Sequence, residues 1–110
     1  MKITGLGASK GSHVGKARVC ATAKQAMSKI KDGDVLVTSM TDPDFVPAMI
    51  LAGAFVTANG GVTCHAAIVA RELGKPCVVG VGAGLAEIIA GGTITVRVEG
   101  REGEVTDGGV

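Results

Sequence analysis

The chain has 110 residues, of which 46% are hydrophobic but only 2% aromatic, and its formal net charge is +1. This length fits a single domain, expected to span residues 1–110, with a core of aliphatic side chains and two Phe. The balanced charge, with no aromatic residues interleaved among the basic ones, argues against nucleic-acid binding.

The three cysteines and the longest uncharged stretch bear on the redox compartment and on membrane insertion. Cys20, Cys64 and Cys77 are odd in number and lack C-x-x-C spacing, which indicates reduced thiols in a cytoplasmic protein rather than a disulfide framework. The uncharged residues 45–70 are long enough to cross a membrane, but Pro47 and several glycines and polar residues interrupt them. No membrane span and no membrane partner are therefore expected.

Short strands alternate with helices along the chain. The opening residues 3–20 contain four glycines and predict a strand, an irregular loop and a second strand near residues 15–20. Later strands are expected at residues 35–38, 54–57, 77–80, 92–98 and 104–106. Helices are expected at residues 22–30, from Thr41-Asp42-Pro43 to Gly53, at residues 64–73 and at residues 85–90. This order predicts an α/β domain with a mixed sheet and packed helices.

The helix predicted at residues 64–73 begins shortly after a glycine pair, Gly60-Gly61. Thr63 is a suitable N-cap, because its hydroxyl can accept a hydrogen bond from the first turn. Gly74 and Pro76 are expected to end the helix. The segment AAIVA that follows His65 is apolar on every side, so this helix is expected to pack inside the domain.

His65 stands in the first turn of that helix, where unpaired backbone amides and the positive end of the dipole attract anions. The same field disfavours the imidazolium ion, so a neutral and nucleophilic imidazole is expected at neutral pH. Gly60 and Gly61 would let the backbone approach a phosphate closely. The placement therefore suits a histidine that carries a phosphoryl group as a covalent intermediate.

Other interpretations of this segment stay open on spacing alone. His65 could be an ordinary surface or capping residue behind glycines that serve only close helix–sheet packing. A zinc site built from Cys64, His65 and the other cysteines is weakly supported, because adjacent Cys-His has poor geometry on one helical turn. Cys64 has no base nearby to make it a nucleophile and is interpreted as a small packing residue. His13 is interpreted as a solvated loop residue.

The segment GGVTCHAAIVARELGKPCVVG, residues 60–80, resembles the phosphohistidine motif of the phosphoenolpyruvate-utilising enzymes. That family comprises phosphoenolpyruvate synthase, pyruvate phosphate dikinase and enzyme I of the sugar phosphotransferase system. The Thr-Cys-His variant is most similar to the synthase branch. Residues 5–19, 41–61 and 92–105 also resemble family segments, so the resemblance covers nearly the whole chain but only one domain of a larger enzyme.

The resemblance implies a swivelling β/β/α domain in which His65 is phosphorylated and shuttles the phosphoryl group between two active sites. Gly60 and Gly61 would form the turn beneath the phosphate, supported by Thr63 and Cys64, and Thr63 would also be a site of regulatory phosphorylation. No tightly bound cofactor and no metal are implied for this chain. The phosphoryl group would come from ATP or phosphoenolpyruvate on nucleotide-binding and phosphoenolpyruvate/pyruvate-binding partners in trans, with Mg²⁺ at the partners' sites.

Some features depart from the synthase pattern, which carries a basic residue between Gly-Gly and Thr and often another before Gly-Gly. This chain has Val62 and Asn59 there. The sequence contains no nucleotide-binding loop and no phosphoenolpyruvate/pyruvate barrel, so it leaves open whether this phosphotransferase component is an enzyme by itself. The alternative is a non-catalytic interaction or regulatory module that docks on a synthase-like enzyme or its regulator. Arg71, in the Ala-Arg position of the motif, is interpreted as a structural residue at the helix end.

Overall fold

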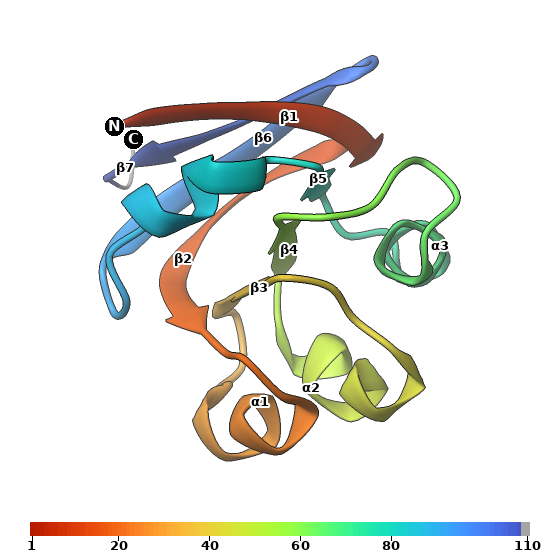
Figure 1. Cartoon of the computed structure of the whole chain (residues 1–110), viewed down its shortest axis with the longest axis vertical. Coiled ribbons are helices and arrows are strands. Elements are labelled where there is room, and N and C mark those ends of the chain that lie inside the picture. Colours follow the sequence, from red (N-terminus) through yellow and green to blue (C-terminus); the bar gives the residue numbers. More distant parts are fainter. Residues whose placement is uncertain (109–110) are drawn as a thin grey trace.

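Within residues 1–108, which the computed structural model describes, seven strands close into a barrel with the three α-helices packed outside it (Figure 1). The strands are β1 (Lys2–Ser9), β2 (Gly11–Val19), β3 (Val35–Thr38), β4 (Ala54–Thr57), β5 (Cys77–Val79), β6 (Thr93–Glu99) and β7 (Glu102–Asp107). The α-helices are α1 (Ala23–Lys29), α2 (Val46–Leu51) and α3 (His65–Leu73), and the 3₁₀ helices are η1 (Pro43–Phe45) and η2 (Gly82–Glu87). No helix of these residues is long and apolar enough to span a membrane.

The barrel wall combines parallel and antiparallel strand pairs in the order β1-β5-β4-β3-β2-β6-β7. The strands from β2 through β3 and β4 to β5 are parallel neighbours, and the remaining pairs are antiparallel. The predicted α/β fold with a mixed sheet and packed helices is confirmed. Its closure was not predicted. It arises because β1 pairs with both β5 and β7, which leaves no free sheet edge in the described part of the chain.

β3, β4 and β5 are almost entirely apolar because both of their faces are buried. Alternate side chains enter the barrel interior, where Val35, Val37 and Val56 pack against residues from β1, β6 and β7. The intervening side chains, such as Leu36 and Phe55, face outward and pack against the helices. The alternation of side chains along each strand thus builds two separate cores on the two faces of the same strands.

The α-helices cover the outer face of the parallel strands, with α1 beside α2 and with α3 beside β4 and β5 (Figure 1). Small side chains dominate their buried faces, which lets the helix backbones approach the sheet closely. These buried alanines are Ala26, Ala48, Ala66, Ala67 and Ala70. The expectation that α3 packs inside the domain was wrong, because one face of the helix is exposed and Ile68 is 46% exposed. The helix packs against the core through its alanine face, with Val69 partly buried beside it.

Some of the predicted boundaries were wrong. No irregular loop separates the first two strands, because only Lys10 lies between β1 and β2. The glycines that suggested a loop lie within strands, and a Cβ on Gly7 would come within 2.5 Å of the Val98 Cγ1. The helix predicted at residues 85–90 is the 3₁₀ helix η2, which starts and ends earlier, and the strand predicted at residues 104–106 is the longer β7.

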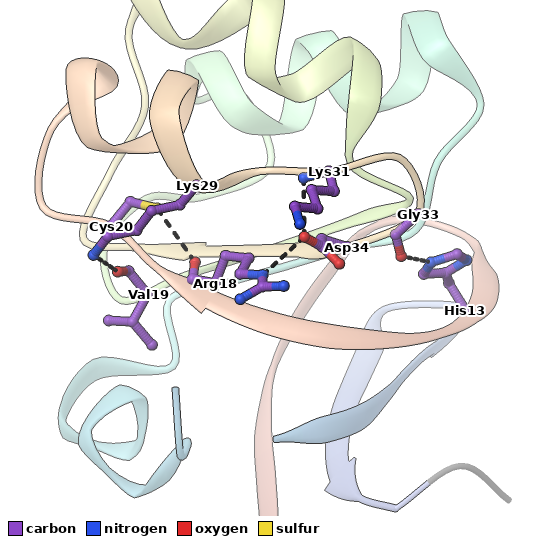
Figure 2. A network of polar contacts seen from close by, with 8 residues as sticks. All are labelled: His13, Arg18, Val19, Cys20, Lys29, Lys31, Gly33 and Asp34. Atoms are coloured by element: carbon purple, nitrogen blue, oxygen red, sulfur yellow. Dashed lines mark hydrogen bonds and ion pairs between the residues drawn. The ribbon is translucent and has the colours of Figure 1, made fainter. Parts of the chain in front are cut away.

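His13 is not the solvated loop residue that was expected. It lies on β2 with a half-buried side chain, and its Nε2 is 2.7 Å from the Gly33 carbonyl oxygen (Figure 2). A carbonyl only accepts, so Nε2 carries a proton and donates it. The ring also lies against Gly53, where an added Cβ would be 2.2 Å from Nε2. His13 therefore fixes the segments that lead into β3 and β4.

A polar network fixes the same end of β3. Asp34 accepts hydrogen bonds from the Arg18 Nε at 2.8 Å and from the Lys31 backbone N–H at 2.9 Å, as Figure 2 shows. Asp34 is nearly buried, so its charge is compensated by an ion pair and a hydrogen bond rather than by water. The network holds the N-terminal end of β3 against β2, at the opposite end of β3 from Thr38.

Candidate functional site

α3 begins at His65 itself, so the histidine lies in the first turn as the sequence predicted. The N-cap is Cys64, and the prediction that Thr63 is the N-cap was wrong. Cys64 has extended backbone angles, and its N–H donates to the Gly61 carbonyl, so the chain enters the helix one residue later than expected. Thr63 lies exposed in the preceding turn. The Cys64 side chain makes no cap hydrogen bond, which leaves the first-turn amides available to an anion.

The two glycines before the helix differ in backbone conformation and in the space available for a Cβ. Gly60 has a φ of +112°, and a Cβ at this position would lie 2.8 Å from the Cys64 Sγ. Gly61 has no positive φ, and a Cβ there would meet open space. The local geometry therefore requires glycine at Gly60 alone. Cys64 packs half-buried between this turn and the helix-side core, as expected of a small packing residue.

A hydroxyl from a different part of the chain orients His65. The Thr41 Oγ1 lies 2.8 Å from the His65 Nδ1. Sequence reasoning assigned Thr41 to the start of the next helix and so missed this role. The N-cap of that helix is Asp42, whose carboxylate accepts from the Asp44 N–H at 2.9 Å. Thr41 is only 8% exposed, so its hydroxyl interacts mainly with the imidazole rather than with water.

A cavity of about 130 Å³ opens beside the imidazole. Its lining comes from the loops after β3 and β4 and from the start of α3: Met40, Thr41, Thr57, Asn59, Gly60, Cys64, His65 and Ala66. The cavity lies at the C-terminal ends of parallel strands, where α/β sheets commonly bind ligands. Thr57 holds the second of these loops, because its Oγ1 donates to the Asn59 carbonyl at 2.7 Å.

Of the residues predicted for the site, Gly60, Cys64 and His65 meet at this cavity, whereas Gly61 and Thr63 lie outside its lining. Thr41 and Thr57 are lining residues that sequence reasoning missed. Thr41 follows β3, and Thr57 is the last residue of β4; both strands were predicted from the sequence. Because the C-terminal ends of parallel strands lie at the same edge of a sheet, this shared position could have identified both residues.

The Thr41 hydroxyl gives the two ring nitrogens of His65 different roles. Nδ1 is engaged, and Nε2 has no hydrogen-bond partner among residues 1–108. A hydroxyl both donates and accepts. It can accept from Nδ1–H while Nε2 holds its lone pair, and it can donate to Nδ1 once Nε2 bears a substituent. The arrangement is therefore suited to attack by Nε2 on an electrophile such as phosphorus.

The described residues form no cluster for a metal ion, and two of the three cysteines are buried. No group of three or more His, Cys, Asp or Glu side chains gathers within residues 1–108. Burial raises the pKa of the Cys77 thiol to about 12, with a further contribution from Cys64, so this thiol is protonated at neutral pH. Burial likewise raises the pKa of Cys20. Neither buried thiol has the thiolate character that a nucleophile needs at neutral pH.

Comparison with known proteins identifies the family. A family model described as the mobile domain of PEP-utilising enzymes matches residues 30–103. This chain belongs to that family, and the resemblance expected from its sequence is confirmed. The NMR solution structure of an Enzyme I protein is similar with a TM-score of 0.56 and 32% sequence identity, over 69% of this chain and 32% of that chain.

Curated relatives include several phosphoenolpyruvate synthases. The probable synthase of Archaeoglobus fulgidus is 50% identical over 106 residues, which are 96% of this chain but 14% of that protein. The synthase of Aeropyrum pernix is 49% identical over 108 residues, which are 98% of this chain and 13% of that protein. The synthase of Deinococcus radiodurans is 49% identical over 105 residues, covering 93% of this chain and 13% of its own length. This chain thus spans only 13–14% of the length of these three relatives.

Proposed function

We propose that this chain is a phosphoryl carrier that is transiently phosphorylated on the Nε2 of His65. The observation that carries the proposal is the 2.8 Å contact between Thr41 and the His65 Nδ1, which leaves Nε2 as the free ring nitrogen. The helix N-terminus around His65 favours a negatively charged product, typically by about 0.3–1 kcal/mol at an exposed site. Membership of the mobile-domain family and similarity to phosphoenolpyruvate synthases support the same function.

In the proposed reaction the lone pair of Nε2 attacks the phosphorus atom of the donor, in line with the leaving oxygen. The Nε2–P bond forms as the P–O bond breaks, and the leaving group departs with the electron pair of that bond. The imidazole then releases its Nδ1 proton to solvent, and the Thr41 hydroxyl turns to donate to Nδ1. Reversal of these steps delivers the phosphoryl group to an acceptor.

The donor and acceptor are proposed to be ATP-type and phosphoenolpyruvate/pyruvate-type sites on partner domains or proteins, with Mg²⁺ bound there. In the relatives the matching segment is a small part of a much longer chain. Attachment to such partners raises the effective concentration of the carrier, typically to about the millimolar range for a short flexible linker. Without it, each transfer depends on a diffusional encounter.

A second candidate function is a non-catalytic module that docks on a synthase-like enzyme or its regulator. Met40 and Val62, near His65, are 61% and 54% exposed. Val62 and Asn59 also replace the basic residues of the synthase pattern. Exposed apolar side chains beside the cavity are suited to contact with another protein. In this case Thr63, exposed before α3, is the residue proposed for regulatory phosphorylation.

Intact-mass spectrometry distinguishes the two candidates. Wild type, His65→Ala and Thr63→Val would be incubated with ATP or phosphoenolpyruvate in an extract of cells that contain a phosphoenolpyruvate synthase. The carrier function predicts one acid-labile phosphoryl group on wild type and Thr63→Val, and none on His65→Ala. No gain of mass with either donor contradicts the carrier function. An acid-stable group that is lost in Thr63→Val supports the regulatory module.

A further inference from the structure

Arg71 joins two segments on either side of the candidate site. Its Nη1 donates to the Ala8 carbonyl of β1 at 2.9 Å, and its Nη2 donates to the Val62 carbonyl at 2.7 Å. These carbonyls are 63 and 9 residues away along the chain. A guanidinium presents several N–H donors in a rigid plane, so one side chain can hold both acceptors in a fixed relation. Hydrogen bonds from an ionised donor are also stronger than those between neutral groups.

The two acceptors are carbonyls at irregular backbone positions. Ala8 lies where the register between β1 and β5 shifts, between the pairs Gly7–Val78 and Ser9–Cys77. Such a bulge interrupts the ladder of backbone hydrogen bonds. Val62 lies in the exposed turn that leads from Gly60 to α3. Arg71 therefore supplies donors at two places where regular secondary structure does not.

Arg71 and His65 lie at opposite ends of α3, so the hydrogen bonds of Arg71 restrict the turn before His65. Arg71 lies in the last turn of α3, whereas Val62 lies three residues before His65 at the other end of that helix. The hydrogen bond to Val62 therefore links the turn before α3 to the last turn of the same helix. The hydrogen bond to Ala8 links this helix and its preceding turn to β1 in the barrel wall. Together they restrict the turn that lines the cavity beside the imidazole.

We propose that Arg71 is a positioning residue, which holds the Gly60–Cys64 turn in the geometry that His65 needs to accept a phosphoryl group. This role rests on the proposed carrier function and adds to it a residue that is not itself part of the cavity lining. A displacement of about 1 Å in a site can cost about 100-fold in rate, so loss of the two bonds is expected to slow the reaction rather than to unfold the chain.

Lys75 offers a matched control within the same protein. Its Nζ donates to three carbonyls at the end of α2, those of Met49 at 3.1 Å, Ile50 at 2.6 Å and Ala52 at 2.5 Å. Like Arg71, it is a cation that satisfies backbone carbonyls. It lies beyond the opposite end of α3 from His65, about 15 Å along the helix axis. Lys75→Met should therefore lower stability without disturbing the site.

The test compares wild type, Arg71→Met, Arg71→Lys and Lys75→Met as full chains. The first readout is the set of backbone ¹H–¹⁵N shifts of residues 60–64 and the ring ¹⁵N shifts of His65, which need no phosphoryl donor. The second is the initial rate of acid-labile labelling, and the third is the free energy of unfolding in urea. Arg71→Met is expected to shift the turn and the ring signals and to slow labelling about tenfold or more.

Arg71→Lys keeps the charge but not the planar fork, and is expected to restore labelling only in part. Lys75→Met is expected to lose stability while keeping the wild-type turn shifts and labelling rate. If Arg71→Met resembles Lys75→Met, with unchanged ring signals and rate, the positioning role is overturned. If wild type takes up no label, the carrier function fails, and the shifts of residues 60–64 and His65 still decide whether Arg71 positions the turn.

Discussion

The Thr41 hydroxyl and the His65 Nδ1 meet at 2.8 Å although 24 residues separate them in the chain. Thr41 follows β3, and His65 opens the helix after β4, so the contact depends on the parallel pairing of these two strands. A half-exposed imidazole without such a partner would exchange between rotamers and tautomers. The barrel thus sets which nitrogen of His65 is hydrogen-bonded within the described residues.

Replacing Thr41 by Val keeps the shape of the side chain and removes the hydroxyl. A net hydrogen bond contributes about 0.5–1.5 kcal/mol, and about 1.4 kcal/mol corresponds to a tenfold change in rate. We therefore expect Thr41→Val to label several-fold to about tenfold more slowly, with a mixture of His65 tautomers in two-bond ¹H–¹⁵N spectra. Thr41→Ser retains the hydroxyl and should resemble wild type. A wild-type rate and tautomer in Thr41→Val would show that the contact does not orient the ring.

Gly60 and Gly61 provide a matched pair for testing the turn beneath the site. Gly60→Ala forces a Cβ-bearing residue to a φ of +112° and places the Cβ 2.8 Å from the Cys64 Sγ. The strain is expected to lower the free energy of unfolding by about 1–3 kcal/mol. Gly61→Ala meets neither obstacle and should be neutral or stabilising by up to about 1 kcal/mol. Urea titrations of the two variants check this difference, and equal losses would contradict the described turn.

Local patterns were sufficient to predict most of the secondary structure. The apolar runs at residues 35–38 and 54–57 were predicted as buried strands and are confirmed as β3 and β4. The end of α3 at Gly74, which has a φ of +67°, also follows from a local signal. Closure of the barrel could not be predicted in this way, because it depends on the pairing of β1 with β7 near the other end of the chain.

The site was predictable only as far as its residues are neighbours in sequence. The segment Gly60–His65 was found because the glycine pair, the helix start and the histidine are contiguous. Thr41 was assigned to a helix start, because Thr-Asp-Pro has that local meaning, and its tertiary contact leaves no trace in the local pattern. His13 was misassigned for the same reason. The glycines around it suggested a loop, whereas its ring fills space against Gly53, far away in sequence.

Cys77 produces a pH dependence of stability whose sign follows from its burial. Burial raises the pKa of its thiol from 9.0 to about 12. The unfolded chain loses this proton as the pH rises through its ordinary pKa of 9.0, whereas the folded chain keeps it. The unfolded state then binds fewer protons, so stability falls as the pH rises from about 9 towards about 12. The slope for one group is at most about 1.4 kcal/mol per pH unit.

Urea unfolding of wild type and Cys77→Ala between about pH 8 and about pH 10.5 measures this contribution. The variant is expected to be less stable at every pH because it leaves a cavity, but to lose less stability as the pH rises. Cys20 and Lys75 also have shifted pKa values and titrate in both proteins, so their contributions cancel in the difference. Parallel curves for the two proteins would contradict the raised pKa of Cys77.

His13 and Gly53 form a contact that a double-mutant cycle isolates. In Gly53→Ala the new Cβ would lie 2.2 Å from the His13 Nε2, so the ring must move away from the Gly33 carbonyl. Overpacking of this kind is expected to cost about 1–3 kcal/mol in the free energy of unfolding. In the His13→Ala background the obstacle is gone, so the same Gly53→Ala change should cost little. Urea unfolding of the four proteins should give a coupling energy of about 1–3 kcal/mol, whereas additive losses would mean that the ring does not lie against Gly53.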